Sequence, residues 1–135
     1  MRVTLVSASF GAFLILDAAT AWSGSALGIR AVLHNCQTAG IDVDTRIQAC
    51  SELIHSNLMA PHTLAAFYVI RGDAYVEKKD LDNAMKDFDK AIELKPDYPD
   101  ALLSRASVLD AMGNHAAAQE DTEHAAKLKD GSPSP

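Results

Sequence analysis

The chain has 135 residues, of which 48% are hydrophobic and 6% aromatic, and its formal net charge is −6. This length suits one domain, and an acidic chain without a Lys/Arg cluster is a poor partner for nucleic acid or for an anionic membrane surface. Abundant alanine and few β-branched runs favour packed helices over a sheet, so we expect an all-α fold.

The first 21 residues have the features of an export signal. Arg2 gives a positive start, Val3 to Leu16 form an apolar stretch, and Ala19-Thr20-Ala21 has the small-x-small pattern of a cleavage site. The apolar stretch is shorter than the roughly 20 residues that a membrane-spanning helix needs. We therefore predict cleavage after Ala21 and a periplasmic or secreted protein with no stable membrane span. An uncleaved N-terminal anchor is the alternative.

Both cysteines of the chain, Cys36 and Cys50, follow the predicted signal. Two thiols in an oxidising compartment usually pair, and a bridge that closes so short a loop would contribute about 3 kcal/mol in the chain-entropy model. A redox-active pair usually needs the closer C-x-x-C spacing. A structural disulfide is the favoured interpretation, and a redox pair and two free thiols are the alternatives.

From the middle of the chain onward, residues recur with a fixed period. Arg71 recurs as Arg105, Ala84 as Ala118, Asp87 as Asp121, Ala91 as Ala125 and Leu94 as Leu128, and the members of every pair are 34 positions apart. A period of this size predicts a solenoid of stacked supersecondary units.

Each unit is predicted to contain two helices. Apolar residues follow one helix face from Leu64 to Tyr75 and a second from Leu81 to Ile92. Asp80 can cap the second helix and Lys95-Pro96 ends it. The next pair begins at Pro99, turns at Gly113-Asn114 and runs to about Leu128.

The segment YVIRGDAYVEKKDLDNAMKDFDKAIELKPDY resembles a tetratricopeptide repeat. The family's pattern of bulky, small and aromatic residues, closed by a proline, is matched at seven positions: Tyr68, Gly72, Tyr75, Ala84, Phe88, Ala91 and Pro96. The resemblance implies a short right-handed α-solenoid of antiparallel helix pairs. It would make these residues the ones that pack the repeat.

A second, weaker repeat follows the first. Its packing positions would be Leu102, Ala106, Leu109, Ala118 and Ala125. We place the repeats at about 65–98 and 99–130, within a unit that spans 61–130, and expect residues 131–135 to be a disordered tail. The last helix has small apolar residues and many charges, as a terminal repeat with a solvent-facing side needs.

The segment before these repeats, residues 22–60, is predicted to be a degenerate helical pair. DVDTRIQACSELIHS resembles the second helix of a repeat, with Asp42 or Asp44 as its cap, and IRAVLHNC a shortened first helix. The stretch as a whole resembles small exported bacterial tetratricopeptide repeat proteins with a two-cysteine N-terminal segment. That resemblance would let a Cys36–Cys50 bridge join the two helices and gives about two and a half repeats.

A few short motifs of the sequence bear on possible chemistry. Arg71-Gly72-Asp73 is an adhesion tripeptide when it lies on an exposed loop, but the period places it inside a helix. The five histidines form no H-E-x-x-H motif, and Glu120 and His124, four apart on one helix face, could hold a zinc ion only with two further ligands from elsewhere. No nucleotide-binding or nucleophile motif occurs. We therefore expect no enzyme activity, no cofactor and no metal.

The resemblance also implies a binding surface on the inner wall of the solenoid, which the first helices of the repeats line. By position, the partner-binding residues would be Val69, Asp73, Val76, Glu77, Leu103, Ser107 and Asp110. Such a mildly apolar, acidic wall suits an apolar or basic peptide segment. The alternative for Val69 and Ile70 is that they pack against the neighbouring helix.

The predicted function is a non-enzymatic protein–protein interaction module, an exported scaffold that holds a partner peptide or protein on its inner wall. A structural envelope component, or an accessory subunit of a larger complex without its own peptide groove, is the alternative. Self-association through an exposed end of the array is also left open.

Overall fold

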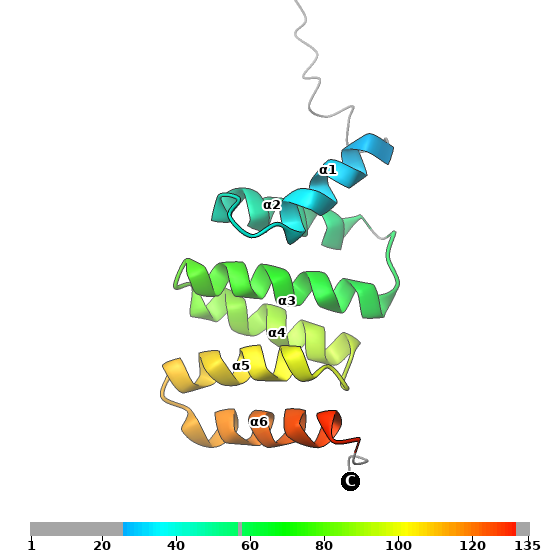
Figure 1. Ribbon diagram of the computed structural model, residues 1–135. Coiled ribbons are helices and arrows are strands. Elements are labelled where there is room, and N and C mark those ends of the chain that lie inside the picture. Colours follow the sequence, from blue (N-terminus) through cyan, green and yellow to red (C-terminus); the bar gives the residue numbers. More distant parts are fainter. Residues whose placement is uncertain (1–25, 57, 132–135) are drawn as a thin grey trace, which may run out of the picture.

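The computed structural model describes residues 26–56 and 58–131, and these ranges are helical with no strand. The helices are α1 (Ala26–Gln37), α2 (Val43–His55), α3 (Pro61–Glu77), α4 (Leu81–Leu94), α5 (Pro99–Ala111) and α6 (His115–Lys129). Figure 1 shows them stacked in chain order, with α1 and α6 at opposite ends. Each helix packs on its successor, and α3 also touches α1 and α5. The expected all-α fold, a short α-solenoid of helix pairs, is confirmed.

Two of the expected segments lie wholly or mainly outside the described residues. These are the signal at 1–21 and the tail, of which only Gly131 is described. None of the helices in the described ranges is both long and apolar enough to cross a membrane.

Side-chain caps start the second helix of each pair. Asp42, Asp80 and Asn114 each accept a hydrogen bond from the backbone N–H three residues further on. These bonds satisfy N–H groups that a helix start leaves unpaired. Of the two candidate caps of α2, Asp42 therefore takes the role and Asp44 lies in the first turn. Counting from these caps therefore assigns equivalent positions to the residues of α2, α4 and α6.

Phe88 of α4 is the centre of the main core. It is fully buried among small and aliphatic residues of α3, α4 and α5, namely Ala65, Val69, Ala84, Ala91, Ala101 and Val108. Gly72 makes this packing fit, because a Cβ there would lie 2.6 Å from Cε1 of Phe88. The close approach of α3 and α4 therefore depends on the missing side chain.

A disulfide takes the corresponding place in the first helix pair. Cys36 of α1 and Cys50 of α2 are joined and fully buried. Cys50 lies at the same distance from its cap Asp42 as Phe88 does from Asp80. In the α1–α2 pair a covalent bridge thus stands where α3 and α4 have an aromatic ring in their core.

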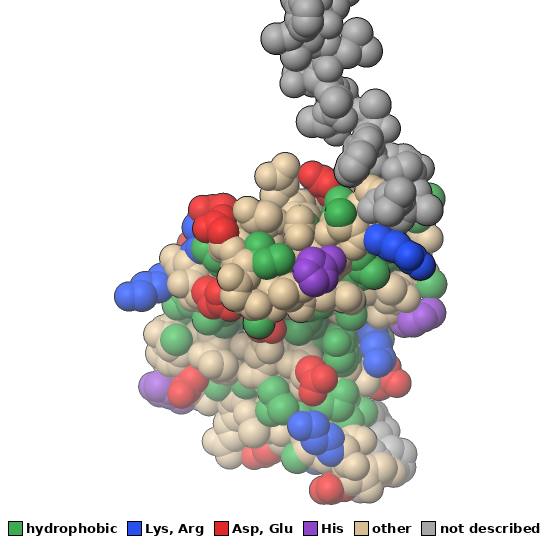
Figure 2. All heavy atoms as spheres, turned by 45° about the horizontal axis from the view of Figure 1, so that its top comes forward, with side chains coloured by type: hydrophobic (Ala, Val, Ile, Leu, Met, Phe, Trp, Pro, Cys, Tyr) green, Lys and Arg blue, Asp and Glu red, His purple; other side chains and the backbone are tan. Residues whose placement is uncertain are grey.

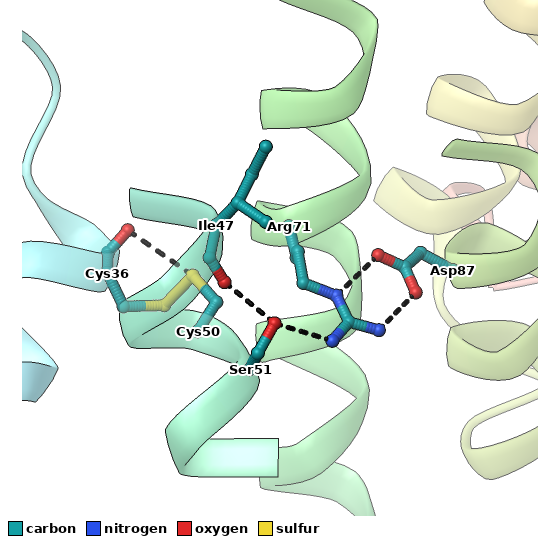
Figure 3. Close-up of a disulfide and its surroundings, with 6 residues drawn as sticks. All are labelled: Cys36, Ile47, Cys50, Ser51, Arg71 and Asp87. Atoms are coloured by element: carbon teal, nitrogen blue, oxygen red, sulfur yellow. Dashed lines mark hydrogen bonds and ion pairs between the residues drawn. A yellow bond between two sulfur atoms is a disulfide. The ribbon is translucent and has the colours of Figure 1, made fainter. Parts of the chain in front are cut away.

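Arg71 of α3 ties three helices together (Figure 3). Its Nε and Nη2 donate hydrogen bonds to the two carboxylate oxygens of Asp87 on α4, at 2.8 and 2.7 Å, and its Nη1 donates to Oγ of Ser51 on α2 at 2.9 Å. Ser51 follows Cys50, so this arginine connects the disulfide-bearing pair to the next pair. A two-bond pairing of this kind fixes orientation as well as charge.

Arg105 repeats the arrangement one unit later. It holds both carboxylate oxygens of Asp121 on α6, at 2.7 and 2.8 Å, and its Nη1 donates to Asp89 on α4 at 2.7 Å. Each arginine thus joins its own pair to the second helix of the preceding pair. This repeated contact holds α3 and α5 in a common orientation and so positions the surface described next.

Candidate functional site

The inner surface comprises six of the residues expected to bind a partner: Asp73, Val76 and Glu77 on α3, and Leu103, Ser107 and Asp110 on α5. All six side chains are exposed, and the two large aliphatic ones, Val76 and Leu103, are 37% and 36% exposed. Asp73 on α3 lies near enough to Ser104 on α5 for that side chain to lower its pKa, so these sides of the two helices adjoin.

Val69, the seventh residue predicted to contact a partner, is not part of this surface. It is only 7% exposed and packs in the cluster that contains Ala101 and Val108 of α5. Its neighbour Ile70 packs against the other cluster, around Cys36 and Cys50. For both residues the structure corresponds to the packing alternative, because the next helix pair on either side covers them.

Asp73 is the acidic centre of the inner surface. Although its side chain reaches solvent, the surrounding protein displaces water, and this desolvation raises the pKa of Asp73. The hydrogen bond from Ser104 and the positive charge of Arg46 lower the pKa, whereas Glu77 raises it. A carboxylate in such a place is stabilised when a cation of a partner pairs with it.

Arg46 of α2 is a residue of this site that the sequence analysis missed. It is 8% exposed, and its Nη2 lies 2.5 Å from Oε1 of Glu77. This contact is an ion pair without hydrogen-bond alignment, and Nε and Nη2 have no hydrogen-bond partner. By its distance from the cap, Arg46 occupies the position of Ala84 on α4. A charged residue at a position where the other repeats have a small buried one was the signal available in the sequence.

A groove of about 400 Å³ lies between α5 and α6 and continues the inner surface. Leu103, Ala106, Ser107 and Asp110 line it from α5, and His115, Ala118, Gln119 and Thr122 from α6. Asp110 and His115 are both exposed and form an ion pair at the turn between the helices when the histidine is protonated. Three of the predicted partner-binding residues thus belong to a concave feature.

Most of the predicted packing residues are buried or half-buried in the helices. Of them, Gly72, Ala84, Phe88, Ala91, Leu102, Ala106, Ala118 and Ala125 are buried, Tyr68, Tyr75 and Leu109 are half-buried, and Pro96 is exposed. The tripeptide Arg71-Gly72-Asp73 lies within α3, where Arg71 is ion-paired and Gly72 is covered by Phe88. A receptor that binds an extended Arg-Gly-Asp loop could not engage it there.

Among the residues that the structure describes, no three His, Cys, Asp or Glu side chains are arranged to hold a metal ion. Figure 2 shows acidic and basic side chains interspersed among hydrophobic ones on the face it draws. The features that remain for binding are the inner surface and the groove between α5 and α6.

Comparison with known proteins agrees with this architecture. A family model described as TPR repeat matches residues 72–113, which run from Gly72 in α3 through α4 and α5 to the turn before α6. None of the curated proteins matches the chain. The matched segment and the helix-pair packing lead to one conclusion: residues 72–113 of this chain are similar to a tetratricopeptide repeat and lie in a solenoid of the same kind of helix pairs.

Proposed function

We propose that this protein is a non-enzymatic scaffold that holds a segment of a partner protein on its inner surface. Tetratricopeptide repeats are protein-interaction modules, and the observation that supports this site is the pair Val76 and Leu103. These aliphatic side chains are exposed on successive first helices, where burial against a partner would remove apolar area from water. The exposed carboxylates of Asp73, Glu77 and Asp110 lie on the same two helices.

The partner segment that fits this surface is aliphatic and basic. Lys or Arg side chains would pair with Asp73 and Asp110, while an aliphatic side chain would lie against Val76 and Leu103. Arg46 offsets part of the acidic charge near Glu77, so the basic side chains of the partner are expected nearer to α5. Charge complementarity of this kind speeds association and selects the partner.

We also propose that the protein works after export, in the periplasm or outside the cell. Two features support this location: the signal-like sequence of residues 1–21 and the joined pair Cys36–Cys50, which an oxidising compartment would favour. The intact mass of the mature protein tests both points, because it gives the first residue and shows whether two thiols appear only after reduction.

Capture from the native envelope extract tests the binding surface. The variants Val76→Lys and Leu103→Lys place a cation among exposed aliphatic contacts, and Leu58→Lys is the matched control because Leu58 is exposed outside the inner surface. We expect the two surface variants to lose partners that the wild type and Leu58→Lys retain. If all four proteins capture the same partners, a structural envelope component or accessory subunit without its own peptide site becomes the better account.

A further inference from the structure

The groove between α5 and α6 has an occupied counterpart one repeat earlier. Each of its lining residues has an equivalent on α3 or α4 that lies 34 positions earlier in the chain, which is also the separation of the caps Asp80 and Asn114. There, Leu103 corresponds to Val69 and Thr122 to Phe88, both of which are buried. The part of the equivalent groove around Val69 and Phe88 is therefore filled, and α5 is the helix that fills it, whereas Asp73 and Val76, the equivalents of Ser107 and Asp110, stay exposed.

The way in which α5 docks on α3 and α4 has two parts. Ala101 and Val108 enter the core cluster of the earlier pair. Beside them Arg105 donates a hydrogen bond to Asp89 on α4 at 2.7 Å. Within the chain, the groove between α3 and α4 therefore binds a helix face that has small and aliphatic side chains with an arginine beside them.

The groove between α5 and α6 retains both parts of this acceptor. Its floor has the small residues Ala106 and Ala118, and Leu103 is an exposed apolar contact. Glu123 lies on α6 at the position of Asp89 on α4 and accepts a hydrogen bond from Gln119 of its own helix. Gln119 and Thr122 replace Met85 and Phe88 of the filled groove. The groove between α5 and α6 is therefore more polar, and water can occupy it when no partner is bound.

We propose that this groove binds an amphipathic helix of a partner protein, one that carries an arginine beside small or aliphatic residues and docks as α5 does. The arginine would pair with Glu123 of α6. This site differs from the proposed contact at Val76 and Glu77, since its acidic group lies on the second helix of a repeat. The inference does not require that the inner surface bind anything.

A peptide with the chain's own α5 sequence is a defined probe. Residues 98–113, YPDALLSRASVLDAMG, would be synthesised with a fluorophore and titrated with the full mature protein, with fluorescence anisotropy as readout. Within the chain, α5 occupies the groove between α3 and α4 at a high effective concentration and would outcompete the free peptide there. The peptide can therefore bind only the open groove between α5 and α6. We expect saturable binding.

Charge reversal assigns the contact. Glu123→Lys should weaken binding of the peptide by about tenfold or more, since an arginine would then face a cation. A peptide in which Arg105 is replaced by glutamate should show the opposite preference. Glu120→Lys is the matched control on the same helix, because its equivalent Lys86 is exposed on α4 rather than covered by α5. It should change the affinity by less than about twofold.

Several outcomes would overturn the proposal. They are an absence of saturable binding, equal affinities of wild type and Glu123→Lys, or a loss of binding in Val76→Lys alone, which would place the peptide on the inner surface. A wild-type dimer in light scattering that Glu123→Lys dissociates would identify a second copy of this chain as the occupant instead. Circular dichroism of each variant confirms that it remains folded.

Discussion

Gly72 tests whether close packing of α3 on α4 defines this repeat. In an ordinary helix, replacing a glycine by alanine stabilises the protein by about 1 kcal/mol, because alanine restricts the unfolded backbone. Here the new Cβ would lie 2.6 Å from Cε1 and 3.0 Å from Cδ1 and Cζ of Phe88. The ring is fully buried and cannot turn away without displacing its neighbours. Overpacking of this kind costs about 1–3 kcal/mol.

The two effects oppose each other, and the steric one is expected to win. Taking about 2 kcal/mol for the overpacking, Gly72→Ala should destabilise the protein by about 1 kcal/mol. Urea unfolding followed by circular dichroism measures this change. A double-mutant cycle with Phe88→Leu isolates its cause, because Gly72→Ala should be stabilising once the ring is gone. If Gly72→Ala stabilises the wild type as it would an open helix, the close contact with Phe88 is not what selects glycine.

Three further predictions concern the contacts around this core. Arg71→Ala should lower the free energy of unfolding, measured by chemical denaturation, by about 3–5 kcal/mol, because it leaves the buried carboxylate of Asp87 unpaired. Removing Asp87 as well should recover part of that loss. Additive effects of the two substitutions would contradict the pairing. Reduction of the Cys36–Cys50 disulfide, which closes a loop of sequence separation 14, should lower the free energy of unfolding by about 3 kcal/mol. The rate of amide hydrogen exchange should rise first in α1 and α2. Exchange that rises equally in α6 would contradict a local role of the disulfide. Asp73→Asn should raise the free energy of unfolding at neutral pH. It should not do so below about pH 3.9, the ordinary pKa of an aspartate. Desolvation raises the pKa of Asp73 when the protein is folded, so the folded protein binds that proton more tightly and stability falls as pH rises through the folded pKa. A stability difference between wild type and Asp73→Asn that does not change with pH would contradict this cause.

The helices could be predicted from the sequence because their signals are local. The apolar positions of α4 recur at helical spacing from Leu81, Asp80 supplies a side-chain cap, and Pro99 stands in the first turn of α5. The fixed recurrence, such as Arg71 with Arg105, then gave the pairing of helices. Each of these features needs only residues that are close in sequence or a comparison of the chain with itself.

The details of the candidate binding surface were harder to predict, because they depend on which helix covers which residue. Val69 and Leu103 are equivalent by position, yet Val69 is buried under α5 whereas Leu103 is exposed in a groove. Arg46 reaches Glu77 only because α2 packs beside α3. The bond from Arg71 to Ser51 likewise crosses between helix pairs. Sequence spacing identifies one face of a helix but does not tell how far the neighbouring pair covers it.

Site-specific photo-crosslinking tests the central proposal most directly. A photoreactive amino acid at Val76 would sample the inner surface, and one at Lys86 of α4, which is exposed and belongs neither to that surface nor to the groove, would serve as the control. After irradiation in intact cells, the proposed function predicts a crosslinked partner protein from position 76 and none from position 86. Crosslinking from position 86 alone, or equally from both positions, would contradict the inner surface as the binding site.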